Sequence, residues 1–290
     1  MKKRIRKRLK MKLNTIYSEI SARFGEVCEN PSFEAKELIK HLCSLSETEF
    51  LLGRNNEISD DATDKIFNLA EKRISGVPLQ YIIGEWDFMG RTFKVGEGVL
   101  IPRPETEILC QYVIDTLKDK KSPCVYDLCS GSGCIAISIK LDTPDADVYA
   151  VEKSKDAYFY LDTNNKLLCA DSAVTLINGD IFNIDEFKTL PKADIIVSNP
   201  PYINSDEIAG LQKEVQFEPA MALDGGSDGL DFYRFIINEW KSLLKSNGTF
   251  AFECGENQAE AISDILKANG FDSFIIKDYN DIDRMVIGRR

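Results

Sequence analysis

Four consecutive residues, Asn199, Pro200, Pro201 and Tyr202, follow an apolar run at 193–198. The Asn side chain and the carbonyl of Pro200 together offer two hydrogen-bond acceptors for one NH2 group, and the Tyr ring offers a planar surface for stacking. A simple turn would account for the two prolines, but it would not require an Asn before them and an aromatic residue after them. The segment therefore indicates a site for a planar amide or amine nitrogen.

A second segment suited to ligand binding is a turn of small residues that follows the apolar segment 124–128. The turn and the acid just before it comprise Asp127, Cys129, Ser130, Gly131, Ser132 and Gly133. A turn of this kind lets a ligand lie against backbone N–H groups at a helix N-terminus. About twenty residues further on, Glu152 ends the next apolar run, where a carboxylate can accept hydrogen bonds from both ribose hydroxyls. Together the two features predict a nucleoside ligand, whereas either alone also fits an ordinary tight turn or a solvated acid.

These residues need strands to position them, and the chain after residue 120 alternates apolar strand patterns with helices. The candidate strands are 124–128, 148–151, 174–177, 194–198, 249–253, 273–278 and 284–288. The clearest helices are 231–244, with Gly248 as a stop, and 258–268, while Pro104 begins a further helix. The alternation predicts an α/β fold with a mainly parallel, doubly wound sheet, which binds ligands at the carboxyl ends of its strands.

The first ninety or so residues are instead typical of short amphipathic helices. Apolar residues recur at helical spacing from Leu13, along 35–45 and up to Ile74. From Pro78, aromatic and β-branched residues alternate among glycines, which favours a β-hairpin. A length of 290 residues also favours one large domain plus a smaller one. We therefore expect a helical domain at 1–77, a hairpin linker at 78–102 and an α/β domain at 103–290.

Charge is unevenly distributed along the chain. The formal net charge is −11, yet eight cations and no acid occur among residues 2–12, so the rest of the chain carries −19. We expect residues 1–12 to form a disordered basic tail, with an arm that touches nucleic acid or the ribosome as the alternative. Such an acidic body disfavours direct binding to duplex nucleic acid and to anionic membranes.

The cysteines and the histidine argue against other classes of site. No CxxC pair occurs among the eight cysteines, and the single histidine is His41, which disfavours a zinc site and catalysis by a Ser-His-Asp or Cys-His set. We expect no metal and reduced, mostly packed thiols. No apolar signal-peptide core follows the basic stretch, and no apolar run approaches about 20 residues. We therefore expect a cytoplasmic protein. Separately, we expect a monomer.

Taken together, the motifs resemble those of class I S-adenosylmethionine-dependent methyltransferases that modify an exocyclic or amide nitrogen. More narrowly, the chain resembles the glutamine methyltransferases of peptide chain release factors. This narrower resemblance rests on segments in family order and at family spacing, namely 78–84, Phe88, Phe93, 99–107 and 217–219. It implies S-adenosylmethionine as cofactor, S-adenosylhomocysteine as product, and the glutamine of the release factor's GGQ loop as methyl acceptor. It also implies a Rossmann-like sheet of seven strands with an antiparallel last strand, and a helical region that engages the release factor.

The resemblance assigns roles to individual residues. Asn199, Pro200, Pro201 and Tyr202 would bind and align the glutamine amide. The cofactor would be held by the turn from Asp127 to Gly133, by Glu152 and Asn199, and by Asp180 and Ile181 near the adenine. Arg103 and Glu218 would contact the substrate or shape its entrance, with capping of a helix by Arg103 and a structural role for Glu218 as alternatives.

One residue departs from the family's glycine-rich turn, because Cys129 stands where the family often has glycine. A cysteine takes a positive φ only at a cost, so we expect an ordinary backbone conformation there or a slightly altered cofactor pose. Gly131 and Gly133 remain in the turn, and the cofactor assignment stands on them.

Three other functions stay open. The Asn-Pro-Pro-Tyr segment also suits an adenine amine extruded from DNA or RNA, although such an enzyme would need a basic groove. A glutamine methyltransferase for a ribosomal protein would carry the same catalytic motifs and differ in the helical region. A non-enzymatic module that binds cofactor and release factor without turnover is the third alternative.

Overall fold

The alternation of strands and helices after residue 120 builds a seven-stranded sheet in the computed structural model, which describes residues 10–169 and 173–290. The strands are β3 (Cys124–Leu128), β4 (Asp147–Glu152), β5 (Thr175–Asn178), β6 (Ala193–Ser198), β7 (Leu244–Glu253), β8 (Asp272–Lys277) and β9 (Asp283–Arg289). Their order is β5-β4-β3-β6-β7-β9-β8, and only β9 runs antiparallel to its neighbours. The predicted fold class is confirmed, with the strand order reversing direction between β3 and β6.

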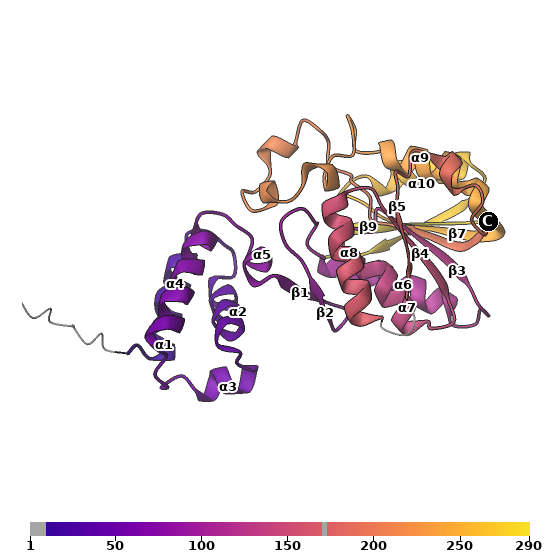
Figure 1. The fold of residues 1–290 in the computed structure, drawn as a ribbon. Coiled ribbons are helices and arrows are strands. Elements are labelled where there is room, and N and C mark those ends of the chain that lie inside the picture. Colours follow the sequence, from indigo (N-terminus) through magenta and orange to yellow (C-terminus); the bar gives the residue numbers. More distant parts are fainter. Residues whose placement is uncertain (1–9, 170–172) are drawn as a thin grey trace, which may run out of the picture. The chain divides into compact units, whose positions relative to one another are not determined.

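Side chains alternate across this sheet and build a core on each face. Val125 and Ile195 lie in one buried cluster, whereas their neighbours Tyr126 and Ile196 lie in the other. The first cluster is covered by α6 (Pro104–Leu117), α7 (Cys134–Asp142) and α8 (Lys155–Leu168), and the second by α9 (Asp231–Glu239) and α10 (Ala259–Ala268) (Figure 1). A sheet covered on both faces explains why β3 and β6 are buried along their whole length.

The helix predicted at 231–244 is shorter than its apolar pattern suggested. The α-helix α9 ends at Glu239, a 3-10 turn spans Trp240–Leu243, and β7 begins at Leu244, so Gly248 lies within a strand and stops no helix. The fully buried Trp240 indole donates a hydrogen bond to the Ile181 carbonyl at 3.0 Å. This contact ties the tightened turn to the chain beyond β5, and a sequence pattern does not show it.

A short hairpin precedes α6 in the chain. It consists of β1 (Glu85–Phe88) and β2 (Arg91–Lys94), paired antiparallel, and it presents the buried rings of Phe88 and Phe93 to the core that α6 and α7 share. A hairpin is thus confirmed, although it is shorter than the segment 78–102 and is preceded there by the helix α5 (Leu79–Ile83). The compact unit that contains the sheet begins at Glu85, so the hairpin belongs to that unit.

The unit that ends at Gly84 is a helical bundle. Its helices are α1 (Leu13–Phe24), α2 (Pro31–Cys43), α3 (Glu47–Leu52), α4 (Asp60–Ile74) and α5. The apolar repeat starting at Leu13 is buried as predicted, and α1, α2 and α4 pack on one another. Arg73 of α4 is 1% exposed and binds Glu34 of α2 through Nε at 2.5 Å and Nη2 at 3.1 Å. A buried Arg is tolerated because the carboxylate pairs with it in this bidentate geometry.

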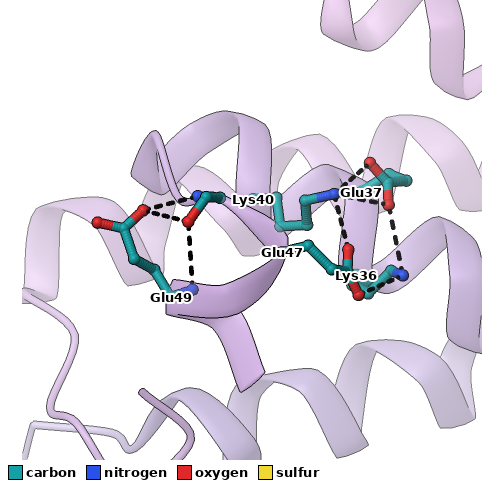
Figure 2. Close-up of polar contacts among 6 residues, drawn as sticks. Lys36, Glu37, Lys40, Glu47 and Glu49 are labelled. Carbon is teal, nitrogen blue, oxygen red and sulfur yellow. Dashed lines mark hydrogen bonds and ion pairs between the residues drawn. The ribbon is translucent and has the colours of Figure 1, made fainter. Parts of the chain in front are cut away.

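Polar contacts define the junction between α2 and α3 (Figure 2). Glu49 donates its backbone N–H to Ser46 Oγ at 3.2 Å, and its carboxylate accepts the Ser46 N–H at 2.8 Å, which is a capping box. Lys40 and Lys36 of α2 reach Glu47 of α3 at 3.0 and 2.9 Å. These pairs are partly exposed and each contributes little, so the cap fixes where α3 begins.

The expected basic tail lies mostly outside the described residues, since residues 1–9 are not among them. Met11 and Lys12 are described, and they are ordered rather than part of a disordered tail. The Met11 carbonyl accepts the Ile58 N–H at 2.9 Å, and Lys12 forms a β-bridge with Glu57. Within residues 10–169 and 173–290, no helix has the length and apolar character needed to cross a membrane.

Candidate active site

The carboxyl ends of β3, β4, β5 and β6 meet at one edge of the sheet, and a cavity opens there. Its wall includes Arg103, Cys129, Ser130, Gly131, Ser132, Glu152, Asp180, Ile181, Asn199 and Pro201 from the predicted set. The remaining predicted residues, Asp127, Gly133, Pro200, Tyr202 and Glu218, are not among the described residues of that wall. The structure therefore brings the turn, the acid that ends β4 and the Asn after β6 together around one space.

Glu152 holds the turn after β3 in place. Its Oε2 accepts the Gly131 N–H at 2.8 Å, and its Oε1 accepts the Ser154 N–H at 2.7 Å. Burial raises the pKa of this carboxyl, while the backbone N–H donors act in the opposite direction. Each carboxylate oxygen has a second lone pair, so Glu152 can still accept hydrogen bonds from a ligand in the cavity.

The two glycines of the turn have different structural roles. Gly131 has a φ of +55°, and a Cβ there would meet no atom within 4 Å, so this position lies open toward the cavity. Gly133 has a φ of +82°, and a Cβ there would lie 2.4 Å from Leu161 Cδ1. Gly133 thus allows α7 and α8 to pack closely, and Gly131 keeps the ligand space clear.

The expectation of an ordinary backbone at Cys129 is wrong. Cys129 has a φ of +61°, in the left-handed region that favours glycine. The conformation is imposed by the turn, in which the next residue, Ser130, donates its N–H to Val151 at 3.1 Å and Gly131 follows at positive φ. Cys129 therefore adopts the glycine-like conformation at a cost of about 1–2 kcal/mol.

This strain predicts that glycine at position 129 gives a more stable protein than alanine, which is the reverse of their usual order. Both Cys129→Gly and Cys129→Ala remove the thiol, but only glycine relieves the positive φ. We expect the glycine variant to have the larger free energy of unfolding, by about 1 kcal/mol, in urea denaturation of the full chain. Alanine is ordinarily the more favourable of the two, so an alanine variant equal to or more stable than the glycine variant would contradict the strain.

Asp127 lies beneath the turn. It is fully buried, and its Oδ2 accepts the Ala136 N–H at 3.1 Å in the first turn of α7. Burial raises its pKa to about 8. Ser130, also buried, donates its hydroxyl to the Asp127 carbonyl at 2.8 Å. These contacts connect β3 to the start of α7, so both side chains support the turn from behind.

Past β5, Asp180 and Ile181 line the cavity next to Glu152. Asp180 accepts the Phe182 N–H at 3.0 Å and pairs with Lys153 Nζ at 2.8 Å. The pKa of Asp180 is lowered because these interactions outweigh its partial burial. Ile181 is 4% exposed and offers an apolar surface held by the Trp240 indole bond to its carbonyl. An anionic acceptor and an apolar wall thus lie side by side.

Asn199 lies at the end of β6, and its side chain is held by a residue that sequence reasoning did not single out. Its Nδ2 donates to Thr106 Oγ1 at 3.3 Å, and the Thr106 hydroxyl donates to Glu253 Oε2 at 2.6 Å. Thr106 lies in the first turn of α6 and lines the cavity, and Glu253 is the last residue of β7. Glu253 had a detectable signal, since it ends the strand beside β6, where ligand-site residues gather.

Arg103 and Glu218 form an ion pair at the cavity. Arg103 Nη2 donates to Glu218 Oε1, and the other carboxylate oxygen accepts the Ile101 N–H at 3.3 Å. Glu218 is 5% exposed, and burial raises its pKa while Arg103 lowers it. Arg103 occupies the N-cap position of α6 without a side-chain capping bond, so its guanidinium serves the pair rather than the helix.

Tyr202 packs on the α9 and α10 side of the sheet. The edge of the Tyr202 ring lies close to Gly255, where an added Cβ atom would be 3.1 Å from Tyr202 Cδ2. The backbone carbonyl of Tyr202 accepts a hydrogen bond from Gln258 Nε2 at 2.8 Å. These contacts fix the backbone that follows Pro201. Among the described residues, no group of three or more His, Cys, Asp or Glu side chains is arranged to hold a metal ion.

Comparison with known proteins agrees with this geometry. The family described as "PrmC N-terminal domain" matches residues 15–84, and that described as "N-6 DNA Methylase" matches residues 97–258. The release factor glutamine methyltransferase of Thermodesulfovibrio yellowstonii is 41% identical over 258 residues, covering 88% of this chain and 91% of that protein. The chain belongs to the release factor glutamine methyltransferase family. A second family member, from Aquifex aeolicus, is 36% identical over 257 residues, covering 89% of this methyltransferase and 90% of its own length.

A solved structure is also similar to this methyltransferase. It is a release-factor-specific protein-(glutamine-N5) methyltransferase from Alicyclobacillus acidocaldarius, 30% identical, with a TM-score of 0.43, and the match covers 68% of this chain and 99% of that chain. With family membership shown, the chain is an enzyme of the methyltransferase class.

Proposed function

We propose that this methyltransferase transfers a methyl group from S-adenosylmethionine to the side-chain amide nitrogen of the glutamine in the GGQ loop of peptide chain release factors. Family membership supports this substrate, because the relatives that cover the chain bear that name. The structural observation that carries it is the Asn199 side chain, whose nitrogen end is bound to Thr106. Its oxygen end is thereby left as an acceptor for an amide NH2.

The cavity has the features that S-adenosylmethionine needs. Gly131 leaves free space above the turn, Glu152 can accept the ribose hydroxyls, and Ile181 provides an apolar wall for the adenine with Asp180 beside it. When bound, the cofactor supplies a methyl group on a positively charged sulfur. Asp127 and Ser130 contribute indirectly, by fixing the turn from below.

The protein's contribution to the reaction is alignment of a weak nucleophile. A glutamine amide nitrogen is unreactive because its lone pair is delocalised into the carbonyl. Asn199 Oδ1 and the Pro200 carbonyl each accept one amide N–H, which directs the lone pair at the methyl carbon. With the cofactor bound, this alignment would let the amide nitrogen take the methyl group, S-adenosylhomocysteine would be the leaving group, and the proton lost from the nitrogen would pass to water to leave a neutral methylamide. Alignment at about 3–3.5 Å can lower such a barrier by roughly 7–11 kcal/mol.

We assign recognition of the release factor to the helical unit that ends at Gly84. The match of residues 15–84 to the "PrmC N-terminal domain" family supports this division of labour. The second candidate substrate is an adenine amine in nucleic acid, which the match to the "N-6 DNA Methylase" family favours. The whole chain has a net charge of −11, and without the eight cations of the basic tail the rest carries −19. This acidic body weighs against nucleic acid as substrate, because a groove that binds nucleic acid needs cations.

Methyl transfer to competing substrates tests the proposal. The protein is incubated with S-adenosylmethionine and, in separate reactions, with purified release factor, ribosomal proteins and duplex DNA, and the products are analysed by mass spectrometry. We expect one methyl group on the release factor, mapped to the loop glutamine, and none on a release factor whose loop glutamine is replaced. Methylation confined to ribosomal protein or to adenine would overturn the assignment.

A further inference from the structure

Three elements that are distant in the sequence converge behind the Asn199 side chain. Thr106 comes from the first turn of α6 and Glu253 from the end of β7, and each is 2% exposed. The chain of hydrogen bonds runs from Asn199 Nδ2 to Thr106 Oγ1 and from the Thr106 hydroxyl to Glu253 Oε2. Glu253 itself is outside the described cavity wall, and it acts on Asn199 both through Thr106 and through its own interaction with the Asn199 side chain.

The number of protons available in these hydrogen bonds determines the orientation of the Asn199 amide. The Thr106 hydroxyl has one proton, and an ionised Glu253 can only accept it, at 2.6 Å. Thr106 Oγ1 can then only accept from Asn199, so the nitrogen end of the Asn199 amide must face Thr106. The oxygen end must face the other way, toward the substrate. A partner able to donate a hydrogen bond itself, such as a protonated carboxyl, would free the Thr106 proton and allow either orientation of the amide.

We propose that Thr106 and Glu253 are positioning residues that fix which end of the Asn199 carboxamide is presented to the substrate. This inference rests on the proposed function, in which Asn199 Oδ1 accepts the glutamine amide N–H. An Asn199 turned the other way would present its own NH2 to the substrate's NH2, and two donors cannot bond each other. The orientation of one side chain therefore decides whether the amide is bound.

The charge of Glu253 makes the orientation dependent on pH. Burial raises the pKa of Glu253 to about 7, against the lowering effects of Thr106, Arg284 and the Asn199 side chain. The titratable and charged groups that act on Glu253 from the surrounding elements are Arg284, Glu105, Tyr202, Tyr233, Cys134 and Cys254. The two tyrosines and two cysteines have raised pKa values and stay neutral near pH 7, and Arg284 stays charged.

Glu253 is thus the buried group that titrates near neutral pH in this cluster. Above about pH 7 the ionised carboxylate accepts from Thr106 and the Asn199 oxygen faces the substrate. Below it the protonated carboxyl can donate to Thr106 Oγ1, which frees the Thr106 proton and removes the constraint on Asn199. Methyl transfer should therefore decline as the pH falls through about 7.

The test compares Thr106→Val, Thr106→Ser and Glu253→Gln with the wild-type enzyme. We expect Thr106→Val to lower kcat about tenfold or more, with the Kd for S-adenosylmethionine within twofold, and Thr106→Ser to recover most of the loss. Glu253→Gln should lower kcat and abolish the acidic limb of its pH profile. Glu105→Gln is the matched control, because it removes a neighbouring acid and should shift that limb only slightly.

A second measurement reads the orientation without methyl transfer. In 15N-labelled protein, the Asn199 side-chain amide resonance, identified by its loss in Asn199→Ala, should shift with an apparent pKa near 7. The shift should be absent in Glu253→Gln and smaller in Thr106→Val, where only the direct interaction of Glu253 with Asn199 remains. A resonance insensitive to pH in the wild type would overturn the inference. An unchanged kcat in a folded Thr106→Val variant, with a wild type that methylates the release factor, would also overturn the inference. A wild type that does not methylate the release factor would overturn only the proposed substrate.

Discussion

Replacing Asn199 with alanine is expected to lower the rate of methyl transfer at least about 100-fold, which corresponds to more than about 2.7 kcal/mol in the barrier. The loss follows from geometry, because the Asn199 oxygen is one of two acceptors that align the substrate nitrogen. S-adenosylmethionine binding should persist, since the turn, Glu152 and Ile181 are untouched. Steady-state rates on a purified release factor and calorimetry with the cofactor measure the two effects separately.

A matched control is available in the same loop. Asn204 Nδ2 donates to Glu207 at 3.1 Å on the surface, outside the cavity wall, so Asn204→Ala removes the same side chain without touching the described site. Its rate should stay close to that of the wild type. A turnover rate for Asn199→Ala within threefold of the wild type would show that two-point recognition of the amide is not central to catalysis.

The sheet could be predicted closely because its strands are apolar, short and separated by helices. The predicted strands begin and end within a residue or two of β3, β4, β5, β6, β8 and β9. The exception is β7, whose first five residues carry no apolar alternation and of which only Leu244 pairs with β6, before an irregularity in the register. The tightened turn at Trp240–Leu243 was missed for a related reason, because a tertiary contact, the Trp240 indole on Ile181, ends the helix early.

The cavity wall was also largely predictable. Gly131, Asp180 and Asn199 each follow a strand and Glu152 ends one, and the carboxyl ends of parallel strands share one edge. That rule places a residue at the edge but does not say which way its side chain points. Asp127 satisfies the rule, yet its carboxylate is turned under α7.

What could not be predicted is the layer behind the wall. Thr106 and Glu253 are 147 residues apart, and only the packing of α6 against β7 brings them into contact. Cys129 is a different case, because the backbone preference of cysteine predicts a negative φ, whereas the turn imposes a φ of +61°. In both cases the outcome depends on tertiary structure: the local sequence does not indicate the contact between Thr106 and Glu253, and it favours the wrong backbone conformation at Cys129.

Replacing Glu152 with alanine is expected to weaken S-adenosylmethionine binding by at least about 100-fold. Hydrogen bonds to a charged acceptor contribute roughly 1.5–3 kcal/mol each, and the substitution removes both acceptors for the ribose. It also releases the Gly131 N–H, bound at 2.8 Å, so the turn itself loosens. The cofactor Kd should rise far more than kcat falls, and saturating cofactor should restore most of the turnover.

Calorimetric titration of S-adenosylmethionine into Glu152→Ala measures this effect, with Asp185→Ala as the control. Asp185 has an 82% exposed side chain and lies outside the described cavity wall, so its removal should leave Kd unchanged. Because burial raises the Glu152 pKa, acidification protonates it sooner than an exposed glutamate, and wild-type affinity should fall with decreasing pH. The alanine variant should lose that dependence. Equal Kd values for wild type and Glu152→Ala would mean that the ribose is held elsewhere and that this carboxylate serves only the turn.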